Sequence, residues 1–332
     1  MKFFGRKVTR PLIVLAIVVT VMVIFGLVIA AIPPVKDQRL GVTFSTVYAR
    51  QLGLDPRETF TALLDDVGVR HFRIPVYWSE VQPSEGEYRW EEIDWMMAEA
   101  ATRGAEVTLA IGYKVPRWPE CYIPDWAEIG GYPFDRDKLL VFLKTTVERY
   151  RDAPALARWQ VENEPYLAFG VCPESDASDI AREVNLVRSL DGRPIVMTAS
   201  GELERWGPTA RQSDLLGVSL YRVTWNRYFG YFRYPVPAAF YRLRAWLVGS
   251  ATDGIFISEL QAEPWFPVPI QDRTPSEWAA EFTAKDLREN VLYAADTGIE
   301  EVDLWGAEWW YFLSKNGHAE LWEEAVRLFA ET

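Results

Sequence analysis

The stretch GIFISELQ, residues 254–261, has the composition of a buried β-strand. A glycine precedes three large apolar residues, two of them β-branched, and polar residues end the run. Seven further runs of this kind recur along the chain, at RLGVTFS (39–45), HFRIPVYW (71–78), EVTLAIGY (106–113), ARWQVENE (157–164), PIVMTAS (194–200), LLGVSLYR (215–222) and EEVDLWGA (300–307).

Helical patterns separate these runs. One helix is expected to begin at Pro56, a favoured first-turn residue, and to stop near Gly68. The others are expected within residues 90–104, 135–152, 177–192, 237–249, 275–298 and 318–331, with a short, weak segment at 207–214. Eight strands alternating with about eight helices predict a (β/α)8 TIM barrel, an α/β fold. A doubly wound open sheet is the alternative, but it favours fewer strands, and no GxGxxG loop follows any run.

Residues 11–32, PLIVLAIVVTVMVIFGLVIAAI, contain no charged side chain. Their 22 residues match the roughly 20 that a helix needs to cross a bilayer. Four basic residues and no acidic ones precede them, which predicts a cytoplasmic N-terminus and a chain that continues outside the cytoplasm. A cleaved signal peptide, giving a secreted protein, is the alternative, although its apolar region is usually shorter.

The expected organisation is a helix followed by one domain. We expect a basic cytoplasmic tail at 1–10, a transmembrane anchor at 11–32, a linker at 33–37 and the barrel at 38–332. The net charge is −12, and the first 32 residues carry four positive charges, so the remainder carries −16. Such a surface repels nucleic acid, and nucleic-acid binding is not expected. We expect a monomeric barrel.

The two cysteines and two histidines limit the chemistry further. His71 and His318 lie far apart without metal-ligand spacing, so neither a metal nor another cofactor is expected. Cys121 follows the third strand and Cys172 the fourth, on neighbouring loops of one barrel face. In an exported protein these two predict a disulfide, the alternative being two buried free thiols.

Two of the strand ends carry carboxylates. Catalytic groups of such barrels lie where the strands end. The fourth run ends in Glu162, Asn163 and Glu164, and the seventh ends in Glu259. Strand alternation places Glu259 on the face of Ile255 and Ile257, toward the barrel mouth, and it aligns Glu164 with Gln160 and Glu162. Two carboxylates facing each other across a mouth are what glycosidic cleavage requires.

At these residues the chain resembles the clan A glycoside hydrolases, the barrel group that includes cellulase-like and β-galactosidase-like families. The segments RIPVYW (73–78), VQP (81–83) and GEY (86–88) also resemble the second strand and loop of that clan. The resemblance covers the whole exported domain and assigns no family. It implies a retaining glycosidase with Glu164 as acid/base and Glu259 as nucleophile, whose carboxyl groups lie about 5–5.5 Å apart.

The resemblance also implies roles for other residues. Asn163 would bind the sugar 2-hydroxyl, Arg73 and Tyr221 would lie beside the nucleophile, and Trp305 would form a sugar platform. Further candidates for substrate binding are Trp78, Trp118, Trp265, Trp310 and Glu263. Glu263 is also the rival nucleophile, although it lies past the strand end. Glu162 departs from the clan's pattern and either pairs with Arg73 or is a buried acid with its own partners.

Several alternatives remain open from the sequence. Tyr and Phe side chains at 228–234 form a substrate wall, a lid, a membrane contact or a loop packed on itself. The chain is a hydrolase of β-linked glycosides, a transglycosylase of the same chemistry, or a catalytically silent carbohydrate-binding barrel. The sugar and the linkage depend on loop shapes that the pattern does not specify.

Overall fold

A closed barrel of parallel strands forms the body of the molecule. The computed structural model describes residues 10–129 and 134–331. The barrel consists of β1 (Arg39–Thr43), β2 (His71–Pro75), β3 (Glu106–Ile111), β4 (Leu156–Val161), β5 (Ile195–Ala199), β6 (Leu215–Leu220), β9 (Gly254–Gln261) and β10 (Glu301–Trp305). Each strand pairs with the next in this order, and β10 pairs with β1. The predicted barrel is confirmed, and the strands fall at the predicted runs, β4 starting one residue earlier.

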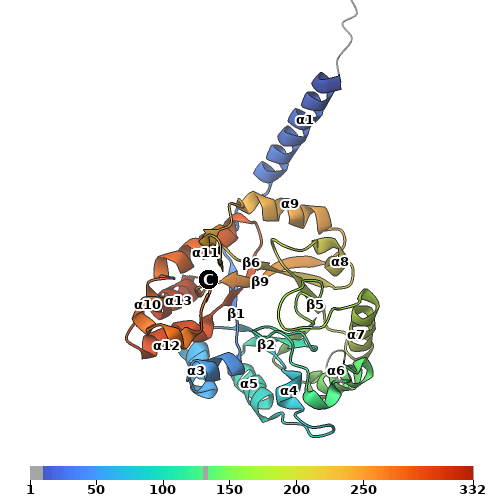
Figure 1. Ribbon diagram of the computed structural model, residues 1–332, viewed down its shortest axis with the longest axis vertical. Coiled ribbons are helices and arrows are strands. Elements are labelled where there is room, and N and C mark those ends of the chain that lie inside the picture. Colours follow the sequence, from blue (N-terminus) through green and yellow to red (C-terminus); the bar gives the residue numbers. More distant parts are fainter. Residues whose placement is uncertain (1–9, 130–133, 332) are drawn as a thin grey trace, which may run out of the picture.

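Helices surround these strands (Figure 1). They are α2 (Thr46–Gln51), α3 (Pro56–Ala62), the π-helix η1 (Leu63–Val67), α4 (Trp78–Val81), α5 (Glu91–Thr102), η2 (Asp125–Ala127), α6 (Arg136–Tyr150), α7 (Ala177–Leu190), α8 (Trp206–Ala210), α9 (Ala238–Val248), η3 (Ile270–Asp272), α10 (Pro275–Ala279), α11 (Ala284–Asp296), α12 (Ala307–Lys315) and α13 (Glu320–Glu331). The first predicted helix begins with Pro56 in its first turn, capped by Asp55, and ends at Gly68 with φ 82°.

The predicted helix over 275–298 is two helices, α10 and α11. Each begins with its own capping box: Thr274 with Glu277 in α10, and Thr283 with Asp286 in α11. A capping box satisfies the free amides of a helix start, so the second box starts a new helix inside an otherwise continuous helical pattern. The prediction of one helix was therefore wrong.

The segment after β6 forms an antiparallel hairpin of β7 (Val223–Asn226) and β8 (Gly230–Arg233). This hairpin contains most of the aromatic residues noted at 228–234, and two of them, Tyr228 and Phe229, are largely exposed at its turn. The Tyr231 hydroxyl donates to the carbonyl of Trp265, which ties the hairpin to the loop after β9. The segment is therefore a hairpin held against a neighbouring loop.

Helix α1 (Arg10–Ala31) projects from the barrel beside α9 (Figure 1). Its length and apolar composition make it a candidate membrane span, with residues Arg10–Ile29 as the apolar stretch. The side chains of that stretch are mostly exposed. Apart from Arg10, the expected basic tail at 1–10 lies outside the described residues. Beyond the helix, the amide of Val35 donates to the carbonyl of Ala295, so the linker is fixed to the barrel at this point.

Candidate active site

Glu259 lies in β9, buried at the mouth of the barrel. Arg73 Nη1 donates to Glu259 Oε1 over 2.9 Å, and the Tyr221 hydroxyl donates to Oε2 over 3.2 Å. Burial and the charge of Glu259 raise the pKa of Tyr221, so the phenol stays protonated as a donor. Both contacts complement a negative charge on Glu259. Glu259 lies at the barrel mouth, as expected. The pairing of β9 with β6 is irregular between Ile257 and Glu259, so strand alternation alone does not explain the direction of the Glu259 side chain.

Arg73 connects the two sides of this site. Its side chain is fully buried at the centre of the barrel. Besides Glu259, it donates from Nε to Gln160 Oε1 over 2.6 Å and from Nη2 to Asn163 Oδ1 over 2.6 Å. One planar guanidinium therefore fixes groups on β4 and β9 relative to each other.

Glu164 lies in the turn just after β4, 8% exposed. Its amide donates to Thr198 Oγ1 over 2.8 Å, and its carbonyl accepts from Lys114 Nζ over 2.9 Å. The carboxyl Oε1 is buried and has no hydrogen-bond partner among the described residues. Burial, with the charge of Glu259 second, raises the pKa of Glu164 well above its usual range. A backbone held by hydrogen bonds thus presents a carboxyl group with a raised pKa, whose Oε1 is unengaged.

Glu162 does not point toward these groups. Its Oε1 accepts from the amide of Tyr113 over 3.0 Å and its Oε2 from the amide of Lys114 over 2.7 Å. The predicted alignment with Glu164 is wrong, because β4 ends at Val161 and Glu162 takes φ 57°. Gly112 makes room for it, since a Cβ there would lie 2.3 Å from Glu162 Oε1. Of the two interpretations of Glu162, the buried acid with its own partners is confirmed and the pairing with Arg73 is not.

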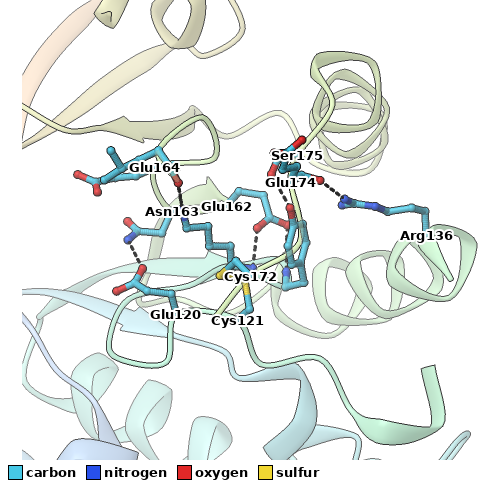
Figure 2. Close-up of a disulfide and its surroundings, with 12 residues drawn as sticks. Glu120, Cys121, Arg136, Glu162, Asn163, Glu164, Cys172, Glu174 and Ser175 are labelled. Carbon is cyan, nitrogen blue, oxygen red and sulfur yellow. Dashed lines mark hydrogen bonds between the residues drawn. A yellow bond between two sulfur atoms is a disulfide. The ribbon is translucent and has the colours of Figure 1, made fainter. Parts of the chain in front are cut away.

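Asn163 contacts Glu120, a carboxylate that the sequence alone did not identify as a site residue. Asn163 Nδ2 donates to Glu120 Oε2 over 3.1 Å, while Asn163 Oδ1 also accepts from Thr198 Oγ1 over 2.9 Å. Glu120 is buried, and burial followed by the charge of Glu259 raises the pKa of Glu120 to about 7. Figure 2 shows Glu164, Asn163 and Glu120 directed to one side, with Glu162 on the other.

The loop that carries Glu120 is covalently fixed. A disulfide joins Cys121 to Cys172, which confirms the predicted pairing (Figure 2). Within the loop the amide of Val115 donates to the carbonyl of Glu120. The adjacency of Glu120 to Cys121, in a loop at the predicted active face, is the one sequence signal that could have singled it out.

Glu263, the rival nucleophile, is engaged in a buried ion-pair cluster. Arg117 donates from Nη1 to Glu263 and from Nη2 to Glu308 Oε2, the latter over 3.0 Å. The guanidinium carbon lies 4.1 Å from the ring centroid of Trp305. Burial raises the pKa of Glu263 to about 7, against the opposing effect of Arg117. Glu263 therefore belongs to the Arg117 cluster, and a pKa of about 7 leaves part of it protonated near neutral pH, which disfavours it as a nucleophile.

The tryptophans divide into core and surface. Trp78 is fully buried and stacks on Phe142, and Trp310 is fully buried with Nε1 donating to the carbonyl of Ala262. The prediction that these two bind substrate was wrong, because both complete the packing under the loops. Trp118 is 60% exposed in the Glu120 loop, and Trp265 packs edge-on against Tyr221, so both remain candidates.

None of the comparisons with sequences yields a match: no protein-family model and no curated protein matches this chain. Solved structures do. A β-galactosidase from the psychrophilic Marinomonas ef1 matches with a TM-score of 0.59 and 15% identity, over 88% of this chain and 59% of its own. The chain has the barrel fold of this β-galactosidase.

Two further structures agree with this likeness. GH5_18 from Streptomyces cattleya, in complex with GlcNAc, matches with a TM-score of 0.58 and 15% identity, over 82% of this chain and 71% of its own. A β-galactosidase from Bacillus circulans sp. alkalophilus matches with a TM-score of 0.61 and 12% identity, over 89% of this chain and 56% of its own. The chain therefore spans little more than half of each β-galactosidase. These structures confirm the predicted barrel fold, which the chain shares with β-galactosidases and a GH5_18 protein.

Proposed function

We propose that this protein is a retaining glycoside hydrolase that cleaves a β-linked glycoside or polysaccharide by double displacement. The observation that carries the proposal is the contrast between two buried glutamates at the ends of β4 and β9. Glu259 has two donors that complement a negative charge, and Glu164 has a raised pKa and a free carboxyl oxygen. When the surroundings of one carboxyl group favour its ionised form and those of the other favour its protonated form, the two groups are suited to act as nucleophile and acid.

In the first step Glu164 donates its proton to the glycosidic oxygen as the bond to the anomeric carbon breaks. Glu259 attacks that carbon from the opposite side and forms a covalent glycosyl ester. Arg73 and Tyr221 hold Glu259 in place, so attack requires no rearrangement of its carboxyl group. The leaving sugar departs with the proton that Glu164 gave.

In the second step the roles reverse. Glu164, now ionised, takes a proton from a water molecule, whose oxygen attacks the anomeric carbon and releases Glu259. Both carboxyl groups then return to their starting states. Where a sugar hydroxyl replaces the water, the same chemistry is transglycosylation, and assays of product size distinguish the two reactions.

Substrate positioning falls to side chains around the pair. Asn163, held by Arg73 and Glu120, would offer its amide to the hydroxyl next to the anomeric carbon. Trp305, Trp118 and Trp265 would supply faces for sugar rings. These roles rest on position beside the two glutamates. No step uses a metal or another cofactor, and we expect the barrel to act as a monomer.

Labelling of the nucleophile tests the proposal. Assays with a panel of aryl β-glycosides first identify a substrate that the protein cleaves. The 2-deoxy-2-fluoro derivative of that substrate is then incubated with the protein. We expect one glycosyl adduct on the peptide that contains Glu259, and none with Glu259→Gln. An adduct on Glu263, or full activity of Glu259→Ala, would contradict the assignment. Sugar binding without turnover or labelling would indicate the silent carbohydrate-binding barrel instead.

We further propose that α1 anchors the barrel to the outer side of the cytoplasmic membrane. The Cys121–Cys172 disulfide supports export, because such bonds persist in oxidising compartments. Protease treatment of intact cells tests this placement. Degradation of the barrel in intact cells supports it, whereas protection until lysis contradicts it, and release of the barrel into the medium indicates a cleaved signal peptide.

A further inference from the structure

We propose that α9 is a membrane-contact helix whose outward face, Trp246 and Leu247 in particular, lies in the headgroup layer of the bilayer that α1 spans. The inference rests on the proposed anchoring by α1 and goes beyond it. It states which surface of the barrel meets the lipid, and so fixes the orientation of the domain on the membrane.

The contact between α9 and the end of α1 determines the level of this surface, that is, its depth along the bilayer normal. Arg242 of α9 donates from Nη1 to the carbonyls of Ile29 and Ile32, over 3.0 Å and 2.7 Å. The apolar stretch of α1 runs from Arg10 to Ile29 and covers roughly 30 Å at about 1.5 Å per residue. Those carbonyls therefore lie where the hydrocarbon ends and the headgroups begin. Arg242 lies at the same level.

The barrel-facing side of α9 is already complete. Tyr241 is buried against Trp206 and Tyr293, and Ala245 and Val248 are partly buried against the core. Positions 241, 245 and 248 follow the helical spacing of a single buried stripe. Trp246 and Leu247 lie outside that stripe, where a soluble surface helix carries polar residues.

Exposure confirms that these two side chains project away from the barrel. Trp246 is 61% exposed and Leu247 62%. Trp246 follows Arg242 by four residues, so it lies on the same side of α9 as the contact with α1. Figure 1 shows α9 at the foot of α1. If α1 spans a bilayer, the surface of that bilayer lies beside the outward face of α9.

The chemistry of the face fits a lipid headgroup layer. Tryptophan is enriched at this layer because its ring is apolar and its indole N–H is a donor. Leu247 adds apolar area at the same level. Arg242, a partly exposed residue, adds a positive charge suited to lipid phosphates at the same level.

Spin labelling of the full chain in phosphatidylcholine vesicles tests the inference. Both native cysteines are joined in the disulfide, so an introduced cysteine is the reactive thiol. Leu247→Cys carries a nitroxide at the proposed contact. Val141→Cys on α6 is the matched control, since Val141 is 59% exposed and α6 lies on the side of the barrel opposite α1 (Figure 1). Collision with oxygen, which enters lipid, is compared with collision with a nickel chelate, which stays in water.

We expect the ratio of oxygen to nickel collisions to be several-fold higher at Leu247 than at Val141. Equal ratios would overturn the inference. Low collision rates with both reagents at Leu247 would also overturn it, because they would show a protein partner or a second copy covering the face.

A third label, at Val19→Cys within α1, separates this inference from the anchoring on which it rests. If Val19 reports lipid while Leu247 reports water, the contact by α9 is refuted and the anchor stands. If Val19 reports water and the chain does not float with the vesicles, both are refuted. Glycosidase activity measured on the same vesicles tests the catalytic proposal independently of either outcome.

Discussion

Arg73 holds the two sides of the candidate site together. Its guanidinium contacts Glu259, Gln160 and Asn163 from within the barrel. Lysine keeps the charge but cannot form all three contacts at once. Its N–H donors all belong to one nitrogen, whereas those of arginine are spread over three. We expect Arg73→Lys to lower the free energy of unfolding by about 3 kcal/mol, the scale of a broken buried ion pair. Urea unfolding measures this, with the exposed Arg89→Lys as a control that leaves stability unchanged. Equal stability of both variants would contradict the network.

The protonation of Glu164 sets the expected pH dependence. Burial and Glu259 raise the pKa of Glu164, and the first step needs its proton. The value of kcat/KM should therefore be maximal below this raised pKa and fall as the pH rises through it. Glu164→Gln should lower kcat by about 10²–10⁴-fold and remove the alkaline limb that Glu164 produces. An unchanged alkaline limb in that variant would assign the acid to another group.

Glu120 should affect the pH at which the alkaline limb of kcat/KM falls. Its negative charge contributes to the raised pKa of Glu164, and the pKa of Glu120 is itself about 7. Glu120→Gln keeps an acceptor for Asn163 but removes the charge present above pH 7. The alkaline limb should therefore move to lower pH, which a pH profile of kcat/KM measures. Glu87→Gln, at an exposed surface position, is the control. A limb that stays in place would show that Glu120 has only a structural role.

The residue scale also shows where sequence reasoning stops. The positions of Glu164 and Glu259 follow from strand ends, but the direction of Glu162 does not, because the chain turns through positive φ once β4 has ended. Trp78 has the composition of a sugar platform yet completes a buried aromatic cluster with Phe142. Glu120 lies beside Cys121, whose disulfide partner is 51 positions away in the sequence.

Among the elements, α10 and α11 show how local hydrogen bonds override a continuous pattern. Thr283 caps α11 by accepting from the amide of Asp286, and its own amide donates to the Asp286 side chain. We expect Thr283→Ala to lower the free energy of unfolding by about 1 kcal/mol. Thr102→Ala, at the exposed end of α5, should change it much less. Thermal or urea unfolding decides, and equal effects would argue against the cap.

Strands were easier to predict than the elements between them. Eight apolar runs are long and regular, and each packs into one barrel, so their pattern is set by burial on both sides. The hairpin of β7 and β8 and the helix α12 escaped prediction. The hairpin strands are four residues each, and α12 follows β10 after a single glycine, Gly306. Their residues are placed by contacts with neighbouring loops rather than by a long period of their own.

For the whole molecule, the disulfide links two loops and closes a separation of 51 residues. Closing a loop of this length restricts the unfolded chain by about 4 kcal/mol in the chain-entropy model. We expect the double variant Cys121→Ser/Cys172→Ser to lose stability on this scale, measured by urea unfolding. It should also lose activity at temperatures where it remains folded, because Glu120 and Trp118 share the released loop. Full activity in the folded double variant would show that the loop holds its shape unaided.

The short linker between α1 and the barrel has a consequence for kinetics. Residues 33–37 include two prolines and span roughly 15 Å when extended, and Val35 is already fixed to the barrel. If α1 anchors the barrel as proposed, a domain tethered so closely would not search a volume. It would sample a thin layer above the membrane surface, and its encounters would depend on how many glycan chains lie in each unit of that area. Substrate concentration would then be a two-dimensional quantity, and a rate measured on dissolved substrate would describe a different search from the one made at the membrane.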